Sequence, residues 1–70
     1  MKKSNLDFLN SVAATEISVD TEIYETGGGY VYLGIDKYEG TEWYLLGTNE
    51  NNFEQMKEAL YEIADRLKSN

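Results

Sequence analysis

The residues with the most obvious chemical potential are the glycines of TGGGYVYLG, residues 26–34. Glycine-rich loops bind phosphates when the N-terminus of a helix follows them. A dinucleotide fingerprint needs a third spaced glycine where this chain has Tyr32, and a Walker loop needs a Gly-Lys-Ser/Thr ending that the segment lacks. The residues after Gly29 alternate as in a strand. The run therefore predicts a β-hairpin turn, which reverses the chain with positive φ.

Two kinds of side chain that often carry catalysis are missing from the sequence. It contains no cysteine and no histidine, so thiolate nucleophiles, imidazole bases and the usual zinc ligands are absent. The segment DKYEGTEW, residues 36–43, places its glycine fifth, whereas an EF-hand calcium loop needs it sixth. Paired carboxylates could hydrolyse glycosides, but so short a chain leaves little room for a deep pocket. We expect a protein that is not an enzyme, with no catalytic residues, no cofactor and no metal site.

The chain is acidic overall. Thirteen acidic and six basic residues give a net charge of −7. Because affinity for nucleic acid requires lysine and arginine to displace counterions, direct DNA or RNA binding is disfavoured. An acidic domain uses its charge either for solubility or to bind a basic partner. Without an apolar run of signal-peptide or membrane-spanning length, we expect a single domain, residues 1–70, that is cytoplasmic and has no membrane association.

The periodicity of apolar residues predicts the elements that must position these groups. Helical spacing predicts a short helix over residues 5–14 and a longer helix within residues 51–68. Between them, a period of two predicts three strands joined by short turns. The predicted fold class is α+β in the order α-β-β-β-α, a three-stranded antiparallel meander with two helices packed on one face. The expected inner residues of the sheet are Ile17, Val19, Ile23, Val31, Leu33, Ile35, Trp43 and Leu45.

The other face of the predicted sheet is open and rich in tyrosine. In the expected register Tyr24 lies opposite Tyr30, Glu22 lies opposite Tyr32, and the third strand adds Tyr44. Tyrosine is frequent in binding surfaces because it offers a large contact area at low entropic cost. The alternative is that these tyrosines only stabilise the sheet through cross-strand pairs. The same face is expected to carry one leucine and five carboxylates, namely Leu46, Glu16, Asp20, Glu22, Asp36 and Glu42.

A row of carboxylates follows the final helix. Glu54, Glu58 and Glu62 are spaced by four residues, and Asp65 lies beside them. Their rise of about 6 Å per four residues is close to the spacing of phosphates along one nucleic-acid strand, so this acidic ridge could imitate a nucleic acid. The alternative is a solvated helix face with partly compensated charge. The compensating pairs would be Glu62 with Arg66, Glu54 with Lys57, and Asp65 with Lys68.

Two resemblances follow from these features. The α-β-β-β-α order, with a glycine-bearing turn before the final helix, is similar to that of the double-stranded RNA-binding domain. That family binds phosphates through lysines at the start of this helix, where the present chain has ENNFE, residues 50–54. The resemblance therefore implies a topology and not RNA binding. The short, acidic, cysteine-free chain also resembles the small inhibitors that phages and mobile elements make against bacterial defence nucleases, of the anti-CRISPR or anti-restriction type.

The second resemblance implies a non-enzymatic inhibitor that binds a basic nucleic-acid-binding surface of a CRISPR effector or related nuclease in the host bacterial cell. The alternative is an assembly module that forms a homodimer, or binds another protein, through its tyrosine-bearing sheet face. A third interpretation is a small regulatory subunit of an enzyme. The candidate partner-binding residues are Asp20, Glu22, Tyr24, Tyr30, Tyr32, Tyr44, Glu54, Glu58, Glu62 and Asp65.

Overall fold

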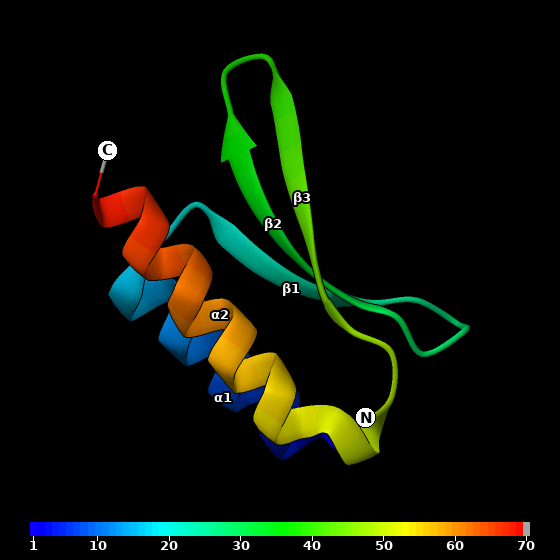
Figure 1. Ribbon diagram of the computed structural model, residues 1–70. Helices are drawn as coiled ribbons and strands as arrows, with labels where there is room; N and C mark the ends of the chain where they lie inside the picture. Colours follow the sequence, from blue (N-terminus) through cyan, green and yellow to red (C-terminus); the bar gives the residue numbers. More distant parts are fainter. Residues whose placement is uncertain (70) are drawn as a thin grey trace.

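Two helices and a three-stranded sheet make up the computed structural model, which describes residues 1–69 (Figure 1). The strands form one antiparallel sheet in the order β1-β2-β3, with β2 in the centre. The predicted α+β fold and its α-β-β-β-α order are confirmed. The elements are α1 (Lys3–Glu16), β1 (Thr21–Glu25), β2 (Val31–Lys37), β3 (Gly40–Gly47), the 3-10 turn η1 (Glu50–Asn52) and α2 (Phe53–Lys68).

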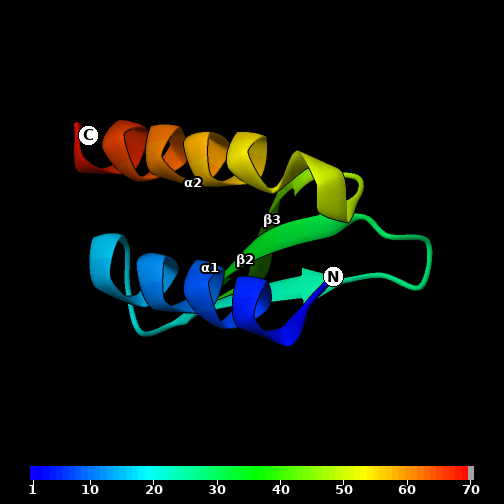
Figure 2. The same cartoon turned by 90° about the horizontal axis from the view of Figure 1, so that it is seen from below.

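Both helices cover the same face of the sheet. They lie side by side and run in the same direction (Figures 1 and 2). Apolar residues recur every three or four positions along each helix, so each one turns a single stripe toward the sheet. Neither helix within residues 1–69 is long and apolar enough to cross a membrane. The buried core between the layers consists of Leu9, Val12, Ala13, Val31, Leu33, Ile35, Leu46, Met56, Leu60, Ile63 and Ala64.

The first strand begins later than its alternating pattern suggests. The pattern predicts a strand with Ile17 and Val19 on the inner face, but α1 extends into this segment and β1 begins at Thr21. Ser18 explains the difference, because its hydroxyl accepts a hydrogen bond from the Asp20 amide (2.9 Å) and so favours a local turn. Ile17 packs against the core, whereas Val19 is 85% exposed. The prediction of Val19 as a core residue is therefore wrong.

The glycine turn sets the register between β1 and β2. Tyr24 pairs with Tyr32 instead of the expected Tyr30, and Glu22 pairs with Gly34 instead of the expected Tyr32. The wider turn is closed at Gly29, which has a φ of 90°. Because side chains alternate with a period of two, this shift of two residues keeps every side chain on its predicted face. The predicted tyrosine pairing is wrong, but Tyr24 and Tyr32 do share the open face.

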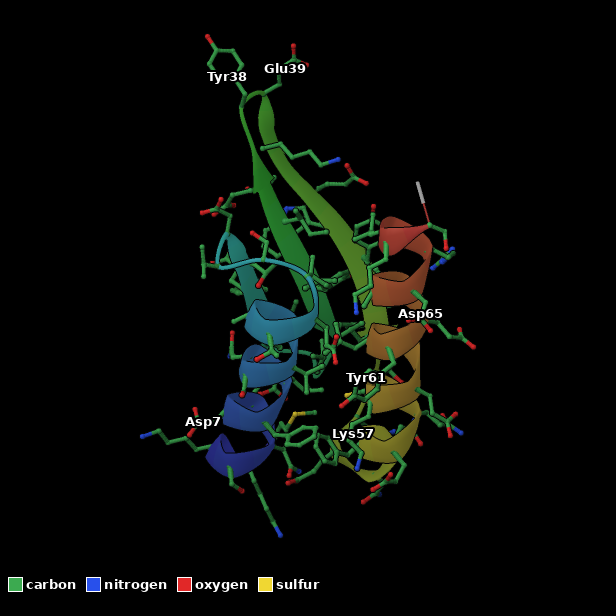
Figure 3. The ribbon with its side chains drawn as sticks, turned by 90° about the vertical axis from the view of Figure 1, so that its left-hand side faces the viewer. Asp7, Tyr38, Glu39, Lys57, Tyr61 and Asp65 are labelled. Carbon is green, nitrogen blue, oxygen red and sulfur yellow. The ribbon has the colours of Figure 1, made fainter. Side chains whose placement is uncertain are left out.

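The turn between β2 and β3 is tighter than expected. Lys37 pairs directly with Gly40, so Tyr38 and Glu39 alone form the loop. Gly40 has a φ of 134°, a conformation that glycine adopts without strain. The hairpin projects beyond the helices, with Tyr38 and Glu39 at its tip (Figures 1 and 3). This turn decides which face each side chain of β3 occupies.

The faces of β3 are the reverse of the predicted ones. Leu33 pairs with Tyr44 and not with Trp43 or Leu45. A change of one residue in register moves all the side chains of a strand to the other face. Trp43 and Leu45 therefore lie on the open face, whereas the sequence placed them in the core. The three residues of β3 that were predicted on the open face but lie on the helix side are Glu42, Tyr44 and Leu46. Glu16, also predicted there, is the last residue of α1.

A β-bulge completes the inner face of β3. The ladder pairs Tyr32 with Leu45 and then skips Leu46, the extra residue of the bulge. Leu46 is only 7% exposed and belongs to the core. The next residue, Gly47, lies under α2, where a Cβ would come within 2.8 Å of Cγ of Met56. The absence of a side chain at Gly47 thus lets the end of β3 pack closely against α2.

Candidate functional site

Three aromatic side chains, one from each strand, gather on the open face of the sheet. The Trp43 ring centroid lies 6.0 Å from that of Tyr24 and 6.4 Å from that of Tyr32, with interplanar angles of 61° and 82°. These are the edge-to-face arrangements that aromatic pairs favour. Together the three rings line a hollow of about 310 Å³. We call Tyr24, Tyr32 and Trp43 the aromatic cluster.

Trp43 reaches the other rings by crossing the central strand. It pairs with Gly34 of β2, which in turn pairs with Glu22 of β1. A Cβ on Gly34 would lie 2.7 Å from Cζ3 of Trp43, so the indole occupies the space of the missing side chain. Trp43 remains 47% exposed and Tyr24 54% exposed despite these contacts. The cluster therefore packs against the sheet on one side and is exposed to solvent on the other.

Further apolar residues extend the cluster along the open face. Leu45 pairs with Tyr32 and is 52% exposed. Tyr30 lies at the glycine-turn end, where its carbonyl accepts a hydrogen bond from the Thr26 amide (2.8 Å), and its ring is exposed. Contiguous exposed apolar side chains on a small protein mark interaction sites more often than scattered ones do.

The charged residues of the open face are acidic throughout residues 1–69. Glu22 lies on the same sheet rung as Trp43. Asp20 and Asp36 lie at the hairpin end, where the Asp36 amide donates to the Asp20 carbonyl (2.9 Å) and the Asp36 carboxylate accepts from the Thr41 hydroxyl (2.8 Å). The open face thus combines exposed aromatic rings with negative charge. The six basic residues lie on the helices, at the start of the chain or on the helix side of the hairpin, and they are Lys2, Lys3, Lys37, Lys57, Arg66 and Lys68.

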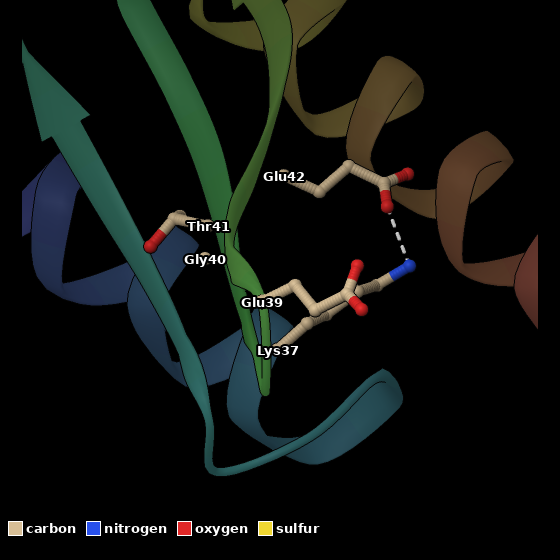
Figure 4. A pocket seen from close by; sticks show the side chains of 5 residues that line it. All are labelled: Lys37, Glu39, Gly40, Thr41 and Glu42. Carbon is tan, nitrogen blue, oxygen red and sulfur yellow. Dashed lines mark hydrogen bonds and ion pairs between the residues drawn. The ribbon is translucent and has the colours of Figure 1, made fainter.

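Tyr44, a predicted binding residue, belongs to a different group on the helix side of the hairpin. Its hydroxyl donates to Glu42, which also accepts a hydrogen bond from Lys37 (Figure 4). The bonds from Lys37 and Tyr44 lower the pKa of Glu42. The same contacts with Glu42 raise the pKa of Lys37 and that of Tyr44. Tyr44 is therefore engaged within the chain and is not part of the open face.

The acidic ridge of α2 is exposed, but one of its members is neutralised. Glu54 forms the predicted ion pair with Lys57, at 3.0 Å. Lys68 pairs with Glu16 of α1 at 2.7 Å and not with Asp65 as predicted. Tyr61 lies on the same side of α2 as Asp65, one turn before it (Figure 3).

Three carboxylates of the ridge stay without an ion-pair partner in the described part of the chain. They are Glu58, Glu62 and Asp65, and the predicted pair between Glu62 and Arg66 does not form. These side chains project from the side of α2 opposite to its buried stripe. The aromatic cluster faces away from the helices, so the ridge and the cluster lie on opposite sides of the molecule. One flat partner surface cannot contact both.

The structure thus divides the predicted site residues. It brings Glu22, Tyr24 and Tyr32 together at the centre of the open face, with Asp20 and Tyr30 at opposite ends. It places Tyr44 on the helix side, and it leaves the remaining four on the far side of the molecule, namely Glu54, Glu58, Glu62 and Asp65.

Trp43 and Leu45 are the open-face residues that sequence reasoning missed, and it also missed that Gly34 makes room for the indole. In the segment WYLL, residues 43–46, both the odd-numbered and the even-numbered residues are apolar enough to be buried. The hydrophobic pattern alone therefore does not show which face of the strand points to the core. Gly34 offered a usable signal, because a glycine within a strand often marks a place where another group approaches closely.

Comparisons of the chain with protein-family models, with curated proteins and with solved structures found no match.

Proposed function

We propose that this protein is a non-enzymatic inhibitor that covers the basic nucleic-acid-binding surface of a CRISPR effector or a related nuclease. The open sheet face makes the contact. The observation that carries this proposal is the coincidence, on one face, of the exposed aromatic cluster with exclusively acidic charge among the described residues. Surfaces that bind nucleic acid are rich in lysine and arginine, so such a face is complementary to them in charge.

The aromatic cluster supplies the contact energy in this proposal. Tryptophan and tyrosine are over-represented among the residues that dominate binding energy, particularly near the centre of an interface. Trp43 lies on the middle rung of the open face and is supported from below by Gly34. Rings that are already fixed lose little conformational entropy on binding.

The acidic ridge has a separate role in this proposal. Because Glu58, Glu62 and Asp65 lie on the side away from the cluster, they contribute to the long-range field and not to the contact. A net charge of −7 accelerates the encounter with a basic partner, and the acceleration falls as salt is added.

A capture experiment tests the proposal. The protein is immobilised and exposed to a bacterial lysate freed of nucleic acid, and retained proteins are eluted with rising salt and identified. We expect the immobilised protein to retain a nucleic-acid enzyme, and we expect added DNA or RNA to displace that enzyme. Trp43→Ala should lose it, while Tyr61→Ala, which removes an exposed aromatic ring from α2, should retain it. Retention of no nucleic-acid enzyme, or retention that nucleic acid does not displace, would contradict the proposal.

A second candidate function is self-assembly, and the free edge of β3 favours it. The edge of β1 is partly closed, because the Asn10 side chain accepts a hydrogen bond from the Ile23 amide (3.1 Å). No strand lies beyond β3 within residues 1–69. Two copies paired at this edge would form a continuous sheet with both aromatic clusters on one side.

Sedimentation at several concentrations separates the two functions. A concentration-dependent dimer that Trp43→Ala disrupts and Glu58→Lys leaves intact would support assembly. A monomer throughout the concentration range would exclude it.

A further inference from the structure

We propose that the hollow between Tyr24, Tyr32 and Trp43 receives the guanidinium group of an arginine side chain from a protein partner. This inference rests on the proposed function, and it names the chemistry by which the open face recognises a basic surface.

The geometry of the hollow suits a planar cation. Two tyrosine rings stand edge-on to the indole, at 61° and 82°, so the three rings form walls around one space. The faces of Trp and Tyr rings attract cations, and arginine also stacks on them through its planar group. A volume of about 310 Å³ is at the lower end of the range for ligand sites. It accommodates one side chain better than a cofactor.

A carboxylate lies within reach of the same space. Glu22 and Trp43 occupy one rung of the sheet with only Gly34 between them. Two strand spacings separate their backbones by about 10 Å, and both side chains extend above the same face. A guanidinium stacked on the rings can therefore donate hydrogen bonds to Glu22. Arginine offers paired, planar donors for this contact, whereas lysine offers a compact and more strongly hydrated charge.

The chain already contains this combination of groups in completed form. Between the helices, Nζ of Lys57 lies 5.4 Å from the ring centroid of Phe8 and 5.1 Å from that of Phe53. The two phenylalanine rings are edge-to-face at 6.0 Å, and Lys57 also pairs with Glu54 at 3.0 Å. The open face has the rings and the carboxylate but, within residues 1–69, no basic side chain. The partner supplies the cation there.

Short peptides test the inference without the whole partner. The probes are N-acetyl-Gly-Arg-Gly-amide and the same peptide with citrulline, which keeps the shape of arginine but is uncharged, or with lysine. Trp43 is the only tryptophan, so its indole N–H signal and its fluorescence report on this site alone. We expect the arginine peptide to shift the Trp43 indole signal and to bind about fivefold more tightly than the citrulline peptide, a difference of about 1 kcal/mol. The lysine peptide should bind more weakly than the arginine peptide.

Matched variants locate the contact. Glu22→Gln should weaken arginine binding, whereas Glu58→Gln, which removes the same charge from the outer side of α2, should not. Tyr24→Leu should weaken it while Tyr61→Leu leaves it unchanged. Both pairs leave Trp43 in place as the reporter, and amide spectra establish that each variant is folded.

The outcomes that would overturn the inference are distinct from those that bear on the function. Equal binding of arginine and citrulline, tighter binding of lysine, or equal effects of Glu22→Gln and Glu58→Gln would each refute an arginine pocket. If the lysate experiment retains a nucleic-acid enzyme through Trp43 but the peptides fail, the inference alone is wrong. If the peptides bind as expected and no such enzyme is retained, the proposed function is wrong and the pocket stands.

Discussion

The indole of Trp43 on β3 occupies the space above Gly34 on β2 that a side chain would otherwise fill. A Cβ at Gly34 would come within 2.7 Å of Cζ3, a distance that ordinary carbon contacts do not allow. The aromatic cluster therefore depends on a residue that has no side chain and contacts no ligand. This relationship gives a way to alter the site without removing any of its rings.

Gly34→Ala should displace Trp43 while leaving the fold intact. The added methyl group meets the far end of an exposed side chain, and alanine is better than glycine within a strand, so the free energy of unfolding should change by less than about 1 kcal/mol. The fluorescence maximum of Trp43 should shift to longer wavelength as the ring leaves Tyr24 and Tyr32. Gly27→Ala is the control, because a Cβ there has no neighbour within 4 Å. An unchanged Trp43 spectrum in Gly34→Ala would show that the ring does not lie over Gly34.

The orientation of β3 can be tested with two adjacent leucines. Leu46→Ala removes a buried side chain from the bulge and should lower the free energy of unfolding by about 2 to 5 kcal/mol. Leu45→Ala removes an exposed side chain and should cost less than about 1 kcal/mol. Urea denaturation followed by circular dichroism measures both changes. The reverse order of effects would mean that Leu45, and with it Trp43, faces the core.

The hydrogen bonds of Glu42 should make stability depend on pH. They lower its pKa from the ordinary 4.5, so the stabilisation is present above pH 4.5 and is lost as the pH falls through the lowered pKa. Lys37 and Tyr44 have pKa values raised from 10.5 and 10.0. The stabilisation that Lys37 and Tyr44 contribute is therefore present below these ordinary pKa values. It is lost as the pH rises through their raised pKa values.

The difference in urea midpoint between wild type and Glu42→Gln measures this contribution. It should be constant near neutral pH and should shrink as the pH falls below 4.5. Glu39→Gln, at the tip of the same hairpin (Figure 3), is the control and should give a small, pH-independent difference. A Glu42→Gln difference that persists unchanged at the lowest pH would mean that the ionised carboxylate is not what stabilises the hairpin.

The sequence predicted an element correctly where its apolar residues recur on one face only. In α2 the buried residues Met56, Leu60 and Ile63 recur at helical spacing, so the helix and its inner side could be predicted. The same holds for β2, where Val31 and Leu33 lie on the inner face as expected. For each of these elements, only one orientation buries the apolar residues.

The sequence was uninformative where both faces of a strand carry apolar residues. In β3 the buried pair would equally well be Trp43 with Leu45 or Tyr44 with Leu46, and the length of the turn at Tyr38 decides between them. The length of a turn depends on backbone geometry, which the pattern of apolar residues does not predict. The candidate site therefore gained Trp43 and lost Tyr44 for one and the same reason.

The affinity of matched variants for the enzyme retained in the capture experiment tests the central claim most directly. The claim is that the open sheet face, and not the outer side of α2, binds the partner. Trp43→Ala should raise the Kd by at least about tenfold, as expected for a central aromatic residue of an interface. Tyr61→Ala should leave the Kd within about twofold. A Kd that rises for Tyr61→Ala and stays unchanged for Trp43→Ala, with both variants folded by their urea curves, would contradict the claim.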